Sequence, residues 1–306
     1  IPAGCRFHPR CAFATDKCKS EEPPLFKLAN GRESKCWIAD PNLTGNWEGP
    51  ILTEENEPVF ELNQHLISKK NLLEVTDLKK YFPITKGILS RTIGHVKAVD
   101  GVTLNIHKGE VLGLVGESGC GKSTVGRLIT GLIDSTNGEV SFDGKQLSNI
   151  NRKEKKVLRK RVQFVFQDPY SSLNPRMTIL DIIGEPLEVH NLAKGSSKRQ
   201  RVGELLEIVG LSKNDMNKFP HQFSGGQRQR AFIAMSLAQN TEVLLLDEPT
   251  TYLDIYHQIE ILEVVKKLNE EHNITIVMVL HDINQAIKYS HNIVIMKNGA
   301  IVNEGS

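Results

Sequence analysis

The sequence predicts an α/β fold, in which buried strands alternate with helices along the chain. Three apolar runs of strand length indicate the strands, at residues 111–115, 243–246 and 274–280. Helix-forming stretches lie between them, such as TVGRLITGLI after the first run and RQRAFIAMSLAQ before the second. The 306 residues are 39% hydrophobic, which is enough for one large or two smaller domains with a real core.

A glycine-rich loop follows the first apolar run. Its sequence, GESGCGKS, matches the phosphate-loop pattern G-x-x-x-x-G-K-[ST] at every fixed position. Glycines let the backbone curl so that its N–H groups point at phosphate oxygens, and the following helix adds its positive end. The lysine reaches the β- and γ-phosphates and the serine ligates Mg²⁺. The predicted nucleoside triphosphate site comprises Gly116, Glu117, Ser118, Gly119, Cys120, Gly121, Lys122, Ser123 and Thr124.

Charge and apolar run length exclude several classes of protein. The net charge of +2 gives no bulk attraction to nucleic acid, so none is expected as a partner. No apolar stretch is long enough to cross a bilayer and no signal peptide is found, so a cytosolic protein is expected. The chain starts at Ile1, as a fragment or a processed product would.

The first fifty residues differ in character from the rest. They contain four of the five cysteines, Cys5, Cys11, Cys18 and Cys36, in a polar segment too small to build its own core. Disulfides are rare in the cytosol, and the C-x₂-C pair of zinc modules is missing. All-cysteine ligation favours an iron–sulfur cluster, with zinc and four free thiols as the alternatives. Residues 51–70 are polar and are interpreted as a linker.

From Asn71 the pattern becomes strand-like. We expect strands in LLEVTDL and VKAVDGVTLNI, separated by a loop from Pro83 to His95. Tyr81 would lie just after the first of these strands, where its ring is either a base-stacking platform or an ordinary half-buried tyrosine.

The middle of the chain combines a short β-turn unit, a basic stretch and an inserted helical part. GEVSFDGKQL predicts a strand and turn, and residues 152–161 predict a solvated helix face, with a nucleic-acid patch as the alternative. RVQFVFQDP predicts a strand ending at Gln167, a glutamine able to reach Mg²⁺ and an attacking water. Helical patterns between residues 178 and 218 indicate a subdomain at about 168–235.

Three further features carry chemistry. Two glycines in FSGGQ precede a helix and expose its N-terminal N–H groups to an anion. The strand VLLL ends in Asp247, expected to hold Mg²⁺ through water, and Glu248, expected to polarise the attacking water. His281 follows the strand ITIVMVL directly and can donate to a γ-phosphate. A parallel sheet would bring these strand ends beside the phosphate loop.

The fixed order of the phosphate loop, Gln167, FSGGQ, LLLDE, Leu253-Asp254 and His281 resembles the nucleotide-binding domain of ABC transporters over about residues 72–306. The resemblance implies a phosphate-loop ATPase fold with a mixed central sheet, a β-rich edge subdomain and an inserted helical subdomain. It implies catalytic roles for Glu248, His281, Lys122 and Gln167, and adenine stacking by Tyr81. It also implies Mg²⁺ ligation by Ser123, Gln167 and Asp247, and nucleotide contacts by Ser224, Gly225, Gly226, Gln227 and Asp254.

Within that family, the motifs of this chain resemble two different groups of importers. YFPITKG and QFVFQDPYSSLNPRM, in residues 72–222, resemble the oligopeptide and dipeptide importer ATPases. DEPTTYLDIYHQIEILE and VMVLHDINQA, in residues 228–306, resemble the ferric-siderophore importer ATPases, as in a recombinant of the two. GCRFHPRC and Cys36-Trp37 resemble the cysteine-rich tail of a peptide importer ATPase subunit, for which a [4Fe-4S] cluster is implied.

The resemblance implies ATP and Mg²⁺ as cofactors and peptide uptake as the function. The implied partners are integral-membrane permease subunits, a second ABC ATPase subunit and, indirectly, a substrate-binding protein, with the chain at the cytoplasmic face of the membrane. Ferric-siderophore uptake is the alternative substrate. A soluble ABC ATPase acting on nucleic acid or ribosomes, and an inactive recombinant, are the alternatives of another class.

Overall fold

A computed structural model of the chain describes residues 4–5, 8, 14–27, 33–37, 40, 67–86, 91–168 and 173–305. The chain forms two compact units, Ile1–Val59 and Phe60–Ser306. The boundary falls inside the predicted linker, of which residues 51–66 lie outside the described part.

The described residues of the first unit form three short elements. They are α1 (Asp16–Ser20) and an antiparallel pair, β1 (Phe26–Lys27) and β2 (Glu33–Ser34). Trp37 links β2 to the α1 region, because the indole Nε1 donates to the Glu21 carbonyl at 3.1 Å and the Lys17 ammonium lies 3.8 Å from the ring centroid. As expected for a segment this small, its described residues bury little apolar surface.

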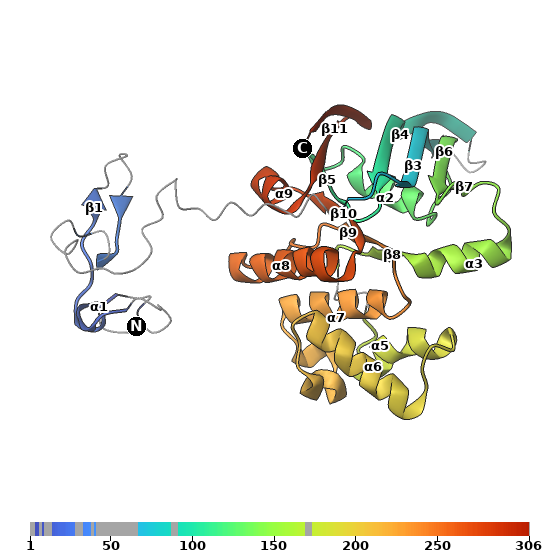
Figure 1. Cartoon of the computed structure of the whole chain (residues 1–306). Coiled ribbons are helices and arrows are strands. Elements are labelled where there is room, and N and C mark those ends of the chain that lie inside the picture. The colour runs from blue at the N-terminus through green and yellow to red at the C-terminus, as the bar shows by residue number, and fades with distance from the viewer. Residues whose placement is uncertain are drawn as a thin grey trace. The chain divides into compact units, whose positions relative to one another are not determined.

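The second unit contains the remaining elements, which Figure 1 shows in chain order from cyan to red. Its strands are β3 (Asn71–Lys86), β4 (Arg91–His107), β5 (Val111–Gly116), β6 (Asn137–Phe142), β7 (Lys145–Gln146), β8 (Val162–Val165), β9 (Val243–Asp247), β10 (Thr275–Leu280), β11 (Asn292–Lys297) and β12 (Ala300–Gly305). Its helices are α2 (Lys122–Ile129), α3 (Arg152–Arg161), α5 (Ile179–Val189), α6 (Gly195–Ile208), η4 (Lys213–Asn217), η5 (Pro220–Gln222), α7 (Gly225–Leu237), α8 (Ile255–His272) and α9 (Ile283–Tyr289).

The strands form two sheets. A six-stranded sheet has the order β12-β11-β5-β10-β9-β8, with parallel neighbours throughout except for the antiparallel edge strand β12. A four-stranded antiparallel sheet has the order β4-β3-β6-β7. The predicted mixed central sheet and β-rich subdomain are therefore confirmed.

The central sheet is buried on both faces, which explains why its strands are continuous apolar runs. Along β10, Ile276, Met278 and Leu280 belong to a core shared with α5–α9. Val277 and Val279 belong to a second core shared with α2 and the antiparallel sheet. Successive side chains of a strand point to opposite faces, so the strands from β11 to β8 contribute to both cores, whereas the edge strand β12 is mostly exposed.

The predicted loop from Pro83 to His95 is wrong. Strand β3 continues to Lys86 and β4 begins at Arg91, so that Pro83 pairs with His95 in a long antiparallel hairpin. Pairing across the hairpin outweighed the turn signals of proline and glycine. Tyr81 consequently lies within β3, and not after it.

The helical subdomain lies together in one part of the unit, where Figure 1 shows α5, α6 and α7 below α8. Apolar residues of α5, α6 and α7 share one core, as predicted for the stretch from residue 178 to 218. Helix α3 buries none of its residues, which confirms the solvated basic face. In the described part of the chain, no helix has the length and hydropathy of a membrane span.

Candidate nucleotide-binding and catalytic site

The phosphate loop joins β5 to α2 in a conformation that needs glycine at two positions. Gly116 has φ +149° and Gly121 has φ +107°. A Cβ atom would lie 2.3 Å from the Met296 carbonyl oxygen at the first position and 2.2 Å from the Ala98 carbonyl oxygen at the second. The backbones of two neighbouring strands thus lie close to the loop, and only glycine fits at these two positions.

Lys122 lies against the inside of this loop. Its ammonium donates to the carbonyl oxygens of Gly116 at 2.8 Å and Glu117 at 3.0 Å, and the residue is only 3% exposed. Residues 117–119 are exposed, and the first-turn N–H groups of α2 have no helical partner. The loop therefore offers backbone donors and one cation to an anionic ligand.

Beside the loop, Ser123 and Asp247 are brought together from α2 and the end of β9. The Ser123 hydroxyl donates to Asp247 Oδ1 at 2.7 Å, and Arg127 Nη2 lies 4.0 Å from Oδ2. Burial of the carboxyl, which is 2% exposed, raises the pKa of Asp247, while Ser123 and Arg127 oppose the rise. A hydroxyl beside a buried carboxylate is an oxygen donor set that fits Mg²⁺.

Glu248 is the centre of a second group. Its Oε2 accepts from Gln167 Nε2 at 2.5 Å and from the Thr251 hydroxyl at 3.2 Å, and its Oε1 lies 2.6 Å from His281 Nε2. The backbone of Glu248 adopts a left-handed φ of +52°, held by its N–H bond to the Val279 carbonyl at 3.1 Å. Such backbone strain in a non-glycine residue occurs preferentially at functional sites.

Gln167 reaches Glu248 although β8 ends earlier than expected. The strand stops at Val165, so the prediction that Gln167 terminates it is wrong by two residues. A two-residue extension beyond the sheet moves the amide across to the end of β9.

The FSGGQ segment is organised differently from the expectation. Helix α7 already begins at Gly225, so the two glycines form its first turn and do not precede it. Ser224 is the N-cap, and its hydroxyl accepts from the Gln227 N–H at 3.3 Å while the Gln227 side chain accepts from the Ser224 N–H at 3.0 Å. This capping box satisfies one of the N–H groups predicted to be available to an anion.

His257 connects the FSGGQ segment to Asp254. Asp254 caps α8 by accepting from the His257 N–H at 3.0 Å, and a Cβ atom on Gly226 would lie 3.0 Å from the His257 ring. The bonds described for these residues are within α7 and α8, and none of them reaches the phosphate loop.

Tyr81 lies in the antiparallel sheet next to the phosphate loop. Its hydroxyl donates to Asp100, and the Lys97 ammonium lies 5.2 Å from the ring centroid. Strand β4 reaches the phosphate loop one residue past Lys97, at Ala98. Adenine stacking by Tyr81 stays a prediction.

The cysteine-rich unit brings Cys5 and Cys18 together, because the Cys5 N–H donates to the Cys18 carbonyl at 2.9 Å. Cys5, Cys18 and Cys36 are free thiols, and Cys11 lies outside the described residues. Among the residues that the structure describes, no group of three or more His, Cys, Asp or Glu could hold a metal ion. The geometry therefore gives no support to the predicted iron–sulfur cluster.

Three residues that contact the predicted site residues were not predicted from the sequence. Thr251 and Arg127 approach the two acidic residues, and His257 joins α8 to the FSGGQ helix. Thr251 lies three residues past Glu248 and His257 three past Asp254, spacings that place a residue one turn away. Arg127 carried no comparable signal, because its approach to Asp247 depends on the packing of α2 on the sheet.

A phosphate loop at the end of the central parallel strand β5, with two acidic residues at the end of β9 in the same sheet, defines a phosphate-loop ATPase domain. The family model described as "ABC transporter" matches residues 99–251, and the chain belongs to this family. It is accordingly an ATP-hydrolysing domain that uses ATP and Mg²⁺.

Curated relatives carry peptide-transport names. The chain is similar to the oligopeptide transport ATP-binding protein AppF of Bacillus subtilis, with 43% identity over 77% of this chain and 72% of the relative. OppF of the same organism is 46% identical over 76% of this chain and 75% of the relative. OppD of Mycobacterium tuberculosis is 36% identical over the whole chain, which spans 49% of that protein. The alignment with OppD thus includes the cysteine-rich segment. All three alignments are longer than the segment 72–222 that carries the peptide-importer motifs.

Solved structures agree in fold. The dimeric ATP-binding cassette MJ0796 bound to ADP and Pi matches with a TM-score of 0.68 and 33% identity, over 76% of this chain and 98% of that one. The cbiO1 protein of Clostridium perfringens, part of the ABC transporter complex cbiONQ, matches with a TM-score of 0.66 and 30% identity, over 78% and 89%.

Proposed function

We propose that this chain is the ATP-hydrolysing subunit of an ABC importer that couples ATP hydrolysis to peptide uptake through separate membrane subunits. The observation that supports it most is the pair of contacts that Gln167 and His281 make with Glu248, next to the Ser123–Asp247 pair. The peptide substrate follows from relatives named for oligopeptide transport at 43% and 46% identity.

In this proposal Lys122 exchanges its two loop carbonyls for the β- and γ-phosphates of ATP. Ser123 and Asp247, with Gln167 nearby, would hold Mg²⁺, which supplies charge neutralisation to the phosphates when bound. An ionised carboxylate accepts about four hydrogen bonds. Three contacts with described residues hold that of Glu248, and a fourth hydrogen bond would come from the attacking water. His281 and Gln167 orient that carboxylate, and His281 can turn to the γ-phosphate.

The remaining nucleotide contacts come from a second ABC subunit. Ser224 is the N-cap of α7, and Gly225, Gly226 and Gln227 form its first turn; the described hydrogen bonds of Ser224 and Gln227 are those of the capping box. In a head-to-tail pair they would close over the ATP of the facing phosphate loop, where their donors stabilise phosphate charge in a dehydrated interface. Asp254 and His257 would transmit the presence of that ligand to α8.

Closure of such a pair would pull on permease helices docked beside Gln167 and the helical subdomain. The chain would then be peripheral, at the cytoplasmic face of the membrane, with a substrate-binding protein acting indirectly. The docking surface lies in the part with peptide-importer motifs, which favours peptide over ferric-siderophore uptake.

The experiment is complementation of two deletion strains, one lacking a peptide-uptake ATPase and one lacking a siderophore-uptake ATPase. Rescue of peptide uptake, together with co-purification of permease subunits, is expected. Rescue of siderophore uptake alone would reverse the choice of substrate. Co-purification with ribosomes or nucleic acid in place of permeases would favour the soluble ABC ATPase, and absence of any ATPase activity would favour the inactive recombinant.

A separate proposal concerns the first unit. Cys5, Cys11, Cys18 and Cys36 would bind a [4Fe-4S] cluster, for which the support is the all-cysteine composition and the resemblance of the segment to a peptide importer tail.

A further inference from the structure

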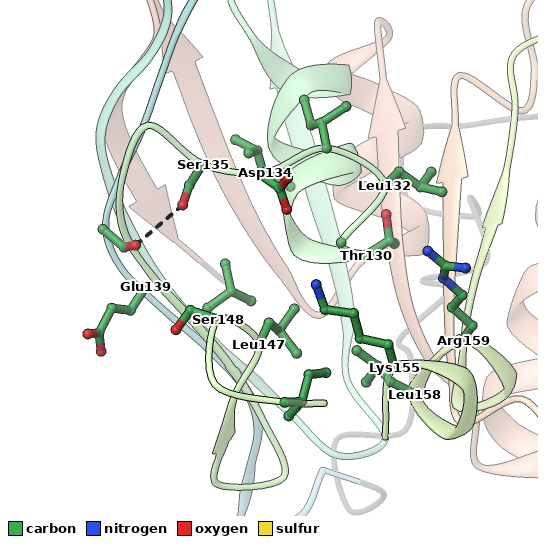
Figure 2. A pocket seen from close by; sticks show the side chains of 16 residues that line it. Thr130, Leu132, Asp134, Ser135, Glu139, Leu147, Ser148, Lys155, Leu158 and Arg159 are labelled. Carbon is green, nitrogen blue, oxygen red and sulfur yellow. Dashed lines mark hydrogen bonds between the residues drawn. The ribbon is translucent and has the colours of Figure 1, made fainter. Parts of the chain in front are cut away.

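A cleft unrelated to the phosphate loop lies between α3, the loop after α2 and the β6–β7 hairpin (Figure 2). Its volume is about 500 Å³, in the range of small-molecule sites. The floor is apolar and continues the core of the antiparallel sheet. It is made by Leu128, Ile133, Val140, Leu147 and Leu158.

The rim carries charges of both signs, since the cleft is lined by Lys155, Arg159, Asp134 and Glu139, of which Glu139 accepts a hydrogen bond from Gln146. Lys155 and Arg159 lie one turn apart on α3, and Figure 2 shows the Lys155 side chain reaching toward the loop that carries Thr130 and Asp134. Among the described residues, neither cation forms an ion pair, and the Asp134 carboxylate forms none either. Facing charges without partners, above an apolar floor, complement a ligand that is itself dipolar.

The side of the cleft that carries Asp134 differs in charge from the side formed by α3. Helix α2 ends at Ile129, and Leu128 and Thr130 line the cleft, so the negative end of the helix lies beside Asp134. Both favour a cationic group there. Lys155 and Arg159, on the α3 side, favour an anionic group. The loop that carries Asp134 is held by Lys80, whose ammonium donates to the Asp134 carbonyl at 2.6 Å.

We infer that this cleft binds a short zwitterionic peptide. Its carboxylate would lie between Lys155 and Arg159, its ammonium beside Asp134, and an apolar side chain on the leucine-rich floor. A volume of about 500 Å³ accommodates two or three residues of such a peptide. The inference rests on the proposed function only for the origin of the ligand, because a peptide importer delivers this chemical class to the compartment of the ATPase.

Occupancy of the cleft would be communicated to the nucleotide site by α2. This helix has the phosphate loop at its first residue, Lys122, and the cleft at its last turn. Gly126 fixes its packing, since a Cβ atom there would lie 2.9 Å from the Leu245 side chain of the central sheet. A ligand that orders the end of α2 therefore changes ATP affinity, and ATP changes ligand affinity by the same factor.

The test is calorimetric titration of the full chain with the tripeptide alanyl-leucyl-alanine. Three further probes are its N-acetylated form, its C-terminal amide and inorganic phosphate. The unmodified peptide should bind, and blocking either end should weaken binding about tenfold, the worth of one hydrogen bond to a charged group. Equal binding of the blocked forms, or equally tight binding of phosphate alone, would show that the cleft does not recognise a zwitterion.

Matched variants keep the test specific. Lys155→Gln with Arg159→Gln, and separately Asp134→Asn, should weaken peptide binding about tenfold. Lys153→Gln with Lys156→Gln neutralises the same number of exposed cations on α3 outside the cleft and should leave binding unchanged. Thermal melting and ATP binding check that each variant is folded. Unchanged peptide affinity in the cleft variants overturns the site, and unchanged ATP affinity at saturating peptide overturns the coupling.

The binding experiment and the complementation experiment test different proposals. Calorimetry on the isolated chain needs no permease, so a failure of peptide-uptake complementation with intact zwitterion binding would contradict the proposed function alone. Complementation without zwitterion binding would contradict the cleft alone.

Discussion

His281 Nε2 lies 2.6 Å from Glu248 Oε1, and this contact joins the residue after β10 to the residue after β9. The two strands are parallel neighbours, so their carboxyl ends coincide at one edge of the sheet. Gln167 arrives at the same carboxylate from beyond β8. The proposed base is therefore held from both sides.

Glu248→Gln should abolish hydrolysis while sparing ATP binding. The amide keeps the size and polarity of the side chain but cannot take a proton, and loss of a general base costs roughly a hundredfold or more in rate. Because opening of the pair depends on hydrolysis, ATP and Mg²⁺ should accumulate a dimer on a sizing column. Glu271→Gln, on the exposed end of α8, is the control. Near-normal turnover would show that Glu248 is not the general base. A monomer that does not hydrolyse ATP would contradict the proposed ATP-bound dimer.

His281→Ala should slow hydrolysis with little loss of ATP binding. Glu248 keeps its contacts with Gln167 and Thr251 but loses the one that fixes Oε1. A hydrogen bond to a charged group is worth about 1.5–3 kcal/mol, so turnover should fall about tenfold to a hundredfold. The exposed His95→Ala on β4 should turn over normally. Equal rates in the two variants would show that the His281 contact is not used in catalysis.

Lys122→Ala should act on binding itself. The ammonium is the cation that the phosphate loop holds inside its curl, at 2.8 Å and 3.0 Å from two carbonyl oxygens. Removing it takes a charge-assisted bond from the phosphates, so ATP affinity should fall at least about tenfold. Equilibrium titration with ATP measures this, with Lys108→Ala as the exposed control. Unchanged affinity would mean that the phosphates bind elsewhere.

Protein purified without oxygen should be brown, with iron and sulfide in near-equal amounts. Replacing Cys5 or Cys36 by serine should lower the iron content, because each would remove one of four thiolate ligands. Cys120→Ser, outside the cysteine-rich unit, should not. Colourless protein with stoichiometric zinc would change the metal, and metal-free protein would leave four free thiols.

Tyr289→Phe should change how stability depends on alkaline pH. Burial, and the hydrogen bond from its hydroxyl to Glu263 Oε1 at 2.8 Å, raise the pKa of Tyr289 in the folded chain. Above about pH 10 the unfolded chain releases this proton while the folded chain keeps it, so the stability owed to the hydroxyl decreases as pH rises. The stability advantage of wild type over Tyr289→Phe should be constant below pH 10 and shrink above it. Urea unfolding of both proteins across that pH range measures this, and a constant difference would contradict it.

The sequence by itself determined four of the six strands of the central sheet (β5, β8, β9 and β10), the phosphate loop and the acidic strand end. Each depends on a local cause: an apolar run that can only be buried, or a glycine spacing that only one backbone conformation satisfies. Gly116 and Gly121 show this, since their positive φ and close neighbours leave no room for a side chain. The family followed from the order of these motifs.

Only the tertiary structure decided which of these residues meet. Gln167 contacts Glu248 because β8 and β9 are parallel neighbours and the chain continues two residues past β8. Arg127 approaches Asp247 through the packing of α2 on the sheet, which no local pattern encodes. The hairpin of β3 and β4 formed across a predicted loop because the two strands pair along their whole length, from Lys86 with Arg91 out to Asn71 with His107. Such extended pairing outweighs the local preferences from which a sequence is interpreted.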